Sequence, residues 1–101
     1  MALLQGERIL FADKIKKTNM FDWTQERTFV VTHFAIYNIH KKTIKRKIYI
    51  KDIGGLTKTR PPSKSMEFAV HVPSHYDYRF SSARRDQILD LLKKLCIIIQ
   101  G

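Results

Sequence analysis

Cysteine is almost absent from this chain of 101 residues, since Cys96 is the only one. A single cysteine excludes an intrachain disulfide, and this composition fits a reducing compartment. Long apolar runs are also missing, because the longest late one, LCIII, is far too short to span a membrane. At the N-terminus, Glu7 and Arg8 come before a signal-peptide core could form. We therefore expect a cytoplasmic protein that meets membranes only at their surface.

Acidic residues are scarce, with nine Asp and Glu against nineteen Lys and Arg, which gives a formal net charge of +10. Such an excess indicates a polyanionic partner, which is a nucleic acid, an anionic membrane face or an acidic protein. The length allows one domain, residues 1–101, and 44% hydrophobic residues are enough for a packed core.

Catalytic and metal-binding patterns are missing as well. His71 and His75 are four residues apart, but Pro73 breaks any helix between them, and a metal site would need more ligands. The short DIGG stretch cannot form a glycine-rich phosphate loop, and no nucleophile stands beside a base. The sequence therefore predicts no enzyme, no cofactor and no metal.

Most of the chain has the pattern of short strands separated by turn residues. Ile9, Phe11 and Ile15 share one parity, and so do Ile44, Ile48 and Ile50, so each set is predicted to face the core. Tyr76 and Tyr78 alternate in the last strand and are also predicted to be core residues. The predicted strands cover residues 8–17, 27–32, 35–39, 44–50, 56–58, 66–72 and 76–81.

The C-terminal part changes from a strand period to a helical period. One helix face is formed by Ile88, Leu91, Leu92, Leu95 and Ile99. Ser81 or Ser82 is suited to cap this helix. Seven strands followed by one amphipathic helix predict a mainly β fold, a pleckstrin-homology-like antiparallel sandwich or barrel closed by the helix.

Several stretches carry a closer resemblance: GERILFADKIKKTN, QERTFVVT, AIYNI, KRKIYIKDIGGL and HVPSHYDYRFSSARRDQIL. In this order they resemble the basic tail homology domain of class I myosins, over about Gly6 to Leu92. The resemblance implies a pleckstrin-homology-like core that binds anionic phospholipids, notably phosphoinositides, and tethers proteins to membranes. The loop TNMFDWTQ is bulkier and less basic than the family's usual loop at this place.

The resemblance also implies a headgroup site at the first hairpin. By the family's spacing, Lys16 and Arg27 are the pair that grips the phosphates. Strand parity favours Lys17 instead, because it shares a face with Phe11 and Ile15. Both lysines stay candidates, and Lys14 is a weaker one. The alternative for Arg27 is an ion pair with Glu26 or Asp13.

A second basic cluster lies in the HKKTIKRK stretch, where Lys41, Lys42, Lys45, Arg46 and Lys47 could attract an anionic leaflet. Such attraction is on the order of 1 kcal/mol per basic residue near the surface. The alternative is a solvated hairpin.

Phe21 and Trp23 stand in the first hairpin loop beside these charges, and we expect them to enter a membrane interface. The alternatives are a hydrophobic cap over the barrel mouth or a contact with a partner protein. The sequence therefore favours a membrane-targeting module for phosphoinositide-containing membranes. A protein-docking or autoregulatory module is the alternative, and nucleic-acid binding is a distant third.

Overall fold

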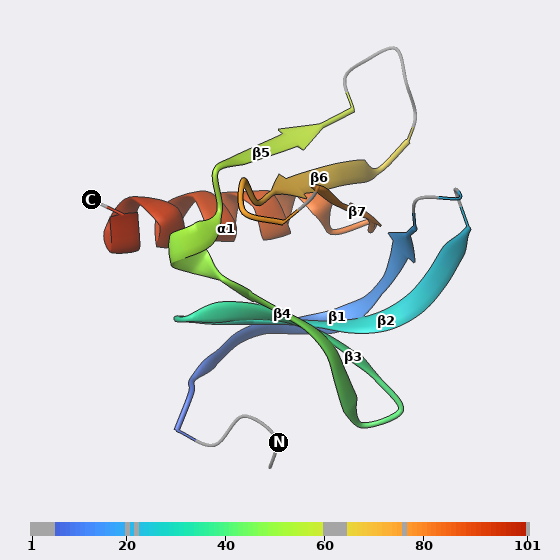
Figure 1. The fold of residues 1–101 in the computed structure, drawn as a ribbon, viewed down its shortest axis with the longest axis horizontal. Coiled ribbons are helices and arrows are strands. Elements are labelled where there is room, and N and C mark those ends of the chain that lie inside the picture. Colours follow the sequence, from blue (N-terminus) through green and yellow to red (C-terminus); the bar gives the residue numbers. More distant parts are fainter. Residues whose placement is uncertain (1–5, 20, 22, 60–64, 76, 101) are drawn as a thin grey trace.

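The computed structural model describes residues 6–19, 21, 23–59, 65–75 and 77–100. Figure 1 shows the order of the elements. These are β1 (Ile9–Thr18), β2 (Thr24–Thr32), β3 (Ala35–His40), β4 (Thr43–Tyr49), a short 3-10 helix η2 (Ile50–Asp52), β5 (Gly55–Lys58), β6 (Glu67–His71), β7 (Asp77–Ser81) and α1 (Arg85–Gln100).

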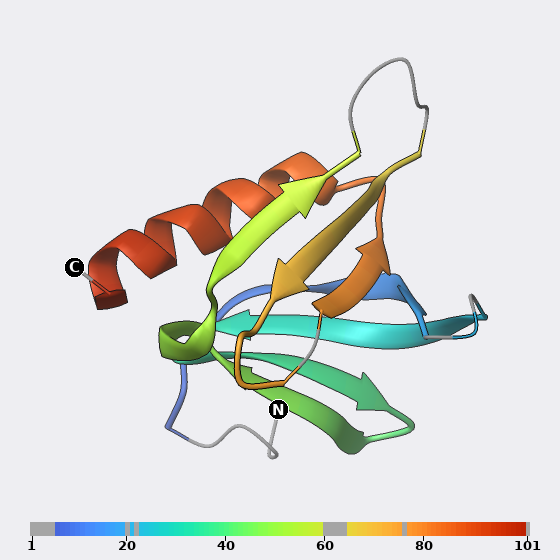
Figure 2. The same cartoon turned by 45° about the horizontal axis from the view of Figure 1, so that its top comes forward.

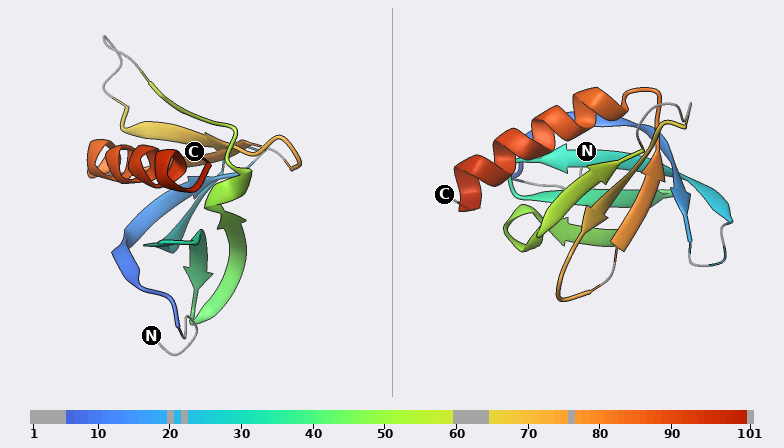
Figure 3. Two further views of the ribbon diagram at one scale, coloured as in Figure 1. Left: turned by 90° about the vertical axis from the view of Figure 1, so that its left-hand side faces the viewer. Right: turned by 90° about the horizontal axis from the view of Figure 1, so that it is seen from above.

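The strands form a single antiparallel sheet in the order β4-β3-β2-β1-β7-β6-β5. The sheet curves back on itself, and β1 joins its two halves (Figure 2). This strand pairs with β2 along its length and with β7 only at Lys16, Lys17 and Thr18. The helix α1 lies along one side of this partial barrel, as both views in Figure 3 show. The predicted pleckstrin-homology-like architecture is confirmed.

The core joins both halves of the sheet to the helix. Phe29 on β2 packs edge-on against Phe68 on β6 and Phe80 on β7, with ring centroids 6.3 and 5.1 Å away. Leu92 of α1 is fully buried in the same cluster. Tyr78 is buried as predicted, whereas Tyr76 lies outside the described residues. Because the core is shared, helix and sheet stabilise each other.

The buried face of α1 differs slightly from the predicted one. It consists of Ile88, Leu89, Leu92 and Leu95. Leu91 is only half-buried, and Ile99 is 39% exposed. The C-terminal turns of α1 extend beyond the sheet (Figure 2), so the helical period continues past the surface that it could cover.

Two β-bulges overturn predictions based on strand parity. The register of β1 against β2 shifts between Ile9 and Phe11, so Ile9 is 39% exposed and does not join the core. The register of β3 against β4 also shifts, which leaves Lys45 without an opposite residue. Ile44 therefore packs on the outer face of the sheet, while Ile48 faces the core. One extra residue in a strand reverses the facing of every residue beyond it.

The first hairpin is longer than predicted. Thr18 pairs with Thr24 and Lys17 with Gln25, so β2 begins three residues before Arg27. The loop shortens to residues 19–23. This polar extension has no apolar alternation, which is why the sequence pattern did not indicate it.

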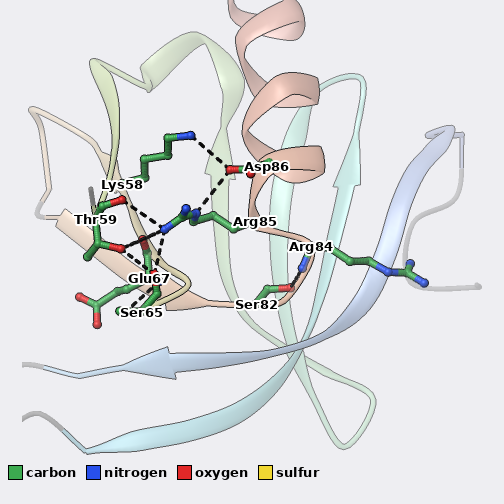
Figure 4. Close-up of polar contacts among 8 residues, drawn as sticks. All are labelled: Lys58, Thr59, Ser65, Glu67, Ser82, Arg84, Arg85 and Asp86. Atoms are coloured by element: carbon green, nitrogen blue, oxygen red, sulfur yellow. Dashed lines mark hydrogen bonds and ion pairs between the residues drawn. The ribbon is translucent and has the colours of Figure 1, made fainter. Parts of the chain in front are cut away.

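The start of α1 is tied to the β5–β6 loop (Figure 4). The Ser82 hydroxyl accepts a hydrogen bond from the Arg84 backbone N–H at 3.0 Å, so Ser82, and not Ser81, is the cap. The Arg85 guanidinium donates to the Thr59 hydroxyl at 2.9 Å and to the Ser65 carbonyl at 3.0 Å. One side chain thus holds both ends of the loop, which links the helix to β5 and β6.

In the part of the chain that the structure describes, α1 and η2 are too short or too polar to cross a membrane.

Candidate functional site

The two faces of β1 present different lysines. Lys16 lies opposite Glu26, and Lys17 lies opposite Gln25. Opposite residues in an antiparallel pair share a face, and successive residues alternate. Because Ile15 is in the core, Lys17 is on the inner face and Lys14 and Lys16 are on the outer face. The structure therefore separates the lysines that the sequence left as alternatives.

The inner face opens into a cavity of about 500 Å³ at the end of the barrel that carries the β1–β2 loop, which we call the mouth cavity. It is lined by Lys17, Thr18, Asn19, Arg46, Asp77, Tyr78 and Arg79. These residues come from β1, β4 and β7 and the segments next to them. The mouth cavity thus receives cations from strands that are far apart in the sequence.

Arg27 lies on the same inner face, opposite Ile15 and two residue pairs farther from the loop than Lys17. Its guanidinium donates to the Glu26 carbonyl oxygen and to Gln25 Oε1, both at 2.9 Å. These acceptors are neutral. The Glu26 carboxylate lies 3.8 Å from Lys14 Nζ, on the other face.

Asp13, the other acidic residue considered for Arg27, also pairs elsewhere. Its carboxylate lies 3.5 Å from Arg84 Nε. Within the part of the chain that the structure describes, the guanidinium of Arg27 is therefore held by neutral acceptors and not by a carboxylate.

The β3–β4 turn adds positive charge at this end. Lys41 and Lys42 occupy its central positions with φ of 48° and 66°, a backbone region that asparagine and glycine normally fill. Burial lowers the pKa of His40 below its usual value, and the charges of Arg27, Lys41 and Lys45 lower it further. After burial, the positive charges of Arg27 on β2 and of Lys41 and Lys45 beside the turn are thus the causes that lower the pKa of His40.

Lys47 has a different environment from the other lysines of its cluster. Its ammonium lies on the outer face, 5.3 Å from the ring centroid of Tyr37 and 4.8 Å from that of Tyr49. A hydrogen bond with Tyr37 is the main reason why the pKa of Lys47 is raised. Tyr37 in turn donates to Glu7. The structure therefore places Lys47 in an aromatic contact away from the mouth cavity.

The β1–β2 loop is organised by one side chain. Asn19 Oδ1 accepts hydrogen bonds from the backbone N–H groups of Phe21 and Trp23, at 2.9 and 3.1 Å. The Asn19 N–H donates to the Trp23 carbonyl at 2.9 Å. Phe21 and Trp23 are each 71% exposed, with ring centroids 6.5 Å apart. This exposure contradicts the alternative that they form a buried cap over the barrel mouth.

The outer face of the hairpin has a cavity of its own, about 480 Å³, which we call the outer cavity. Its lining residues are Asp13, Lys14, Ile15, Lys16, Glu26, Met66, Ser81, Ser82, Ala83 and Arg84. Lys14 and Arg84 are the basic residues that pair with Glu26 and Asp13. Basic and acidic side chains are therefore mixed in the outer cavity.

From the sequence, Arg46 is expected only to attract an anionic leaflet together with the lysines of its cluster, and Asn38 has no expected role. These two residues are directly opposite each other on β3 and β4, and Asn38 is also opposite the core residue Phe29. Asn38 is therefore on the inner face, where it is 1% exposed. A polar residue at a core-facing position of AIYNI was the available signal. For Arg46 the available signal was its parity with Ile48, which faces the core.

Solved structures with the same fold share little sequence with this chain. The C-terminal domain of a Leishmania infantum protein has a TM-score of 0.80 at 13% identity, covering 95% of this chain and 90% of its own. A pleckstrin homology domain solved in solution has a TM-score of 0.74 at 20% identity, covering 97% and 93%. These matches show the fold alone.

A third structure contains a ligand. It is the C-terminal pleckstrin homology domain of pleckstrin in complex with D-myo-Ins(1,2,3,5,6)P5, with a TM-score of 0.73 at 10% identity, covering 88% of this chain and 96% of its own. Among curated proteins, none matches this chain.

The family comparison is more specific than the fold comparison. A family model described as the unconventional myosin tail, actin- and lipid-binding, matches residues 1–100. The match spans both halves of the sheet and the helix. The chain therefore belongs to the unconventional myosin tail family of actin- and lipid-binding domains.

Proposed function

We propose that this domain targets membranes by binding anionic phospholipids, and that its mouth holds a phosphoinositide headgroup. Lys17, Arg27 and Arg46 are the residues that we assign to the headgroup. The observation that carries the proposal is that these cations come from β1, β2 and β4 and share the inner face of the sheet, where Lys17 and Arg46 line the mouth cavity.

Convergence matters because isolated charges bind weakly in water. A pair of unit charges about 4 Å apart is worth about 1 kcal/mol in bulk water, and more where solvent is partly excluded. Arginine adds a planar fork that matches phosphate oxygens. Arg27 is already held by neutral acceptors, so its charge remains available for an anion.

We assign the remaining basic residues to long-range electrostatic attraction of the anionic membrane. Lys41, Lys42 and Lys45 surround the mouth, and the lowered pKa of His40 reflects the charge of Lys41 and Lys45 there. Lys14 and Lys16 on the outer face and Lys47 beside its tyrosines add to the attraction without touching the headgroup. Each contributes less than a converging residue, because exposed charges are screened within about 8 Å at physiological ionic strength.

Phe21 and Trp23 give the mouth an apolar edge. Their rings project from the loop next to Lys17, Thr18 and Asn19 of the mouth cavity. Aromatic rings of this kind favour the headgroup layer of a bilayer. We assign them to membrane contact, with the mouth facing the leaflet.

The alternative is a protein-docking module. The family description names actin beside lipid, and the same basic mouth would suit an acidic protein surface. One experiment separates the two functions. The domain is sedimented with phosphatidylcholine vesicles, with phosphatidylserine vesicles, and with phosphatidylserine vesicles that contain phosphatidylinositol 4,5-bisphosphate.

We expect strong pelleting with phosphoinositide, weaker pelleting with phosphatidylserine alone and none with phosphatidylcholine. Equal pelleting with both kinds of anionic vesicle would show that the domain has no site specific for the phosphoinositide headgroup. An absence of pelleting with any vesicle, together with co-sedimentation with actin filaments, would favour the docking function.

A further inference from the structure

The buried amide of Asn38 has no hydrogen-bond partner among the described residues. Its side chain is 1% exposed, and neither Nδ2 nor Oδ1 is paired within the part of the chain that the structure describes. Buried amides are nearly always hydrogen-bonded, because an unpaired one destabilises the fold. Such a group calls for a role beyond packing.

Asn38 lies beside a residue of the mouth cavity. Arg46, the residue opposite it on β4, lines this cavity. Arg46 alternates with the core residue Ile48, which places it on the inner face beside Asn38. Arg27 is on the same face of β2, and its Nε is also buried without a partner among the described residues. An unpaired donor and an unpaired amide therefore lie on the same inner face of neighbouring strands, next to the proposed headgroup site.

The chemistry of the amide restricts what it can bind. Nδ2 donates hydrogen bonds and Oδ1 accepts them. A phosphate dianion offers acceptors only, so it would leave Oδ1 unsatisfied. A hydroxyl accepts one bond and donates another, so it satisfies both ends of the amide.

We propose that Asn38 is a specificity-determining residue that recognises a free hydroxyl of a polyol phosphate. The Nε–H of Arg27 donates to a neighbouring oxygen of the same ligand. To admit this hydroxyl, the guanidinium of Arg46 turns aside, because Asn38 is buried and Arg46 lines the cavity next to it. The inference rests on the proposed headgroup site and adds to it a preference for cyclitol phosphates with unsubstituted hydroxyls.

Two soluble ligands separate hydroxyl recognition from charge. Inositol 1,4,5-trisphosphate carries free ring hydroxyls, whereas inositol hexakisphosphate carries none and has more charge. Binding of both is measured by isothermal titration for the unmodified domain and for Asn38→Leu. We expect Asn38→Leu to weaken the trisphosphate about tenfold, the value of a hydrogen-bonding group lost from a binding site. The hexakisphosphate should bind the variant unchanged.

The melting temperature gives a second readout. Replacing an unpaired amide by an apolar group of similar size is neutral or stabilising. We therefore expect Asn38→Leu to melt no lower than the unmodified domain. The matched control is Thr32→Val, because Thr32 is also buried but its hydroxyl accepts from the Phe34 and Ala35 N–H groups at 3.1 and 3.2 Å. This control should melt lower and keep the ratio of the two affinities.

The inference would be overturned if Asn38→Leu kept the ratio of the two affinities, whether both ligands bind as before or both bind more weakly by the same factor. If Asn38→Leu does not fold, the ratio is read from Asn38→Ala by the same criteria. A domain that binds neither ligand nor phosphoinositide vesicles would refute the proposed function itself. Vesicle preference that survives in Asn38→Leu together with an unchanged ratio would refute only the role of Asn38.

Discussion

The inner and outer faces of the β1–β2 hairpin both carry basic residues beside a cavity of similar size, about 500 and 480 Å³. Their neighbours differ. Beside the outer cavity, Lys14 lies 3.8 Å from Glu26 and Arg84 lies 3.5 Å from Asp13. On the inner face, Arg27 bonds to a carbonyl and an amide.

The number of basic residues therefore does not define an anion site. What distinguishes the inner face is that, among the described residues, no carboxylate bonds to Arg27, and that residues of several strands meet there around a cavity. Asp77 lines the mouth cavity, but its carboxylate lies 2.8 Å from Nδ1 of His71. The following predictions test whether the two faces differ in function as they differ in structure.

The largest effect is expected when the positive field at the mouth is removed. Lys41, Lys42 and Lys45 changed together to Ala should weaken binding to all anionic vesicles by roughly 3 kcal/mol at low salt, at on the order of 1 kcal/mol per residue. Sedimentation over a salt series measures this loss. The control changes Lys51, Lys93 and Lys94 to Ala, which removes equal charge from η2 and the C-terminal half of α1. Equal losses in both triples would show that only total charge matters.

A smaller effect is expected when the converging arginine is removed. Arg27→Ala should weaken binding to phosphoinositide vesicles by about 1.5–3 kcal/mol, the range for hydrogen bonds to charged groups, and should affect phosphatidylserine vesicles little. Arg84→Ala is the matched control on the outer face and should keep the preference. Circular dichroism checks folding. A folded Arg27→Ala that retains full preference would place the headgroup elsewhere.

The loop aromatics should affect attachment without affecting preference. Trp23→Ala is expected to weaken binding to both kinds of anionic vesicle by about 1–2 kcal/mol, because the ring leaves water for the interface. Phe34→Ala is the control, since Phe34 is 55% exposed between β2 and β3, at the opposite end of the barrel. The interface role of Trp23 would be excluded if both variants bound like the unmodified domain.

The smallest effect is a shift in the titration of His40. Burial and the charges of Arg27, Lys41 and Lys45 keep its pKa below the usual value in the free domain. A bound anion offsets these charges, so the pKa should rise on adding inositol 1,4,5-trisphosphate. The complex then binds more protons than the free domain, and affinity should increase as the pH falls through this range. Nuclear magnetic resonance of the imidazole measures both pKa values, and an unchanged pKa would separate His40 from the ligand.

The sequence predicted the strands, the helix and the core wherever apolar residues repeat regularly. Phe68, Val70 and Val72 alternate and are buried, and Leu92 lies in the core. Prediction failed where one residue is inserted into a strand. Ile9 and Ile44 lie beyond the register shifts, and a bulge depends on pairing that no local pattern records.

The site was predictable only in part for the same reason. Strand parity indicated Lys17 on the inner face, because β1 is regular from Phe11 to Thr18. Arg46 shares the parity of the core residue Ile48, but its place in one cavity with Lys17 depends on how the sheet closes. The contact of Lys47 with Tyr37 and Tyr49 depends on the pairing of β3 with β4. These are tertiary facts, so the basic run HKKTIKRK could not reveal which of its members reach the mouth cavity.

The most direct test compares Lys17→Ala with Lys16→Ala. The two residues are adjacent, carry the same charge and lie on opposite faces, so the field lost at a distance is nearly equal. Binding of each variant is measured on phosphatidylserine vesicles with and without phosphatidylinositol 4,5-bisphosphate. We predict that Lys17→Ala loses the phosphoinositide preference and that Lys16→Ala keeps it. Equal behaviour of the two variants, or loss of preference in Lys16→Ala alone, would contradict an inner-face site.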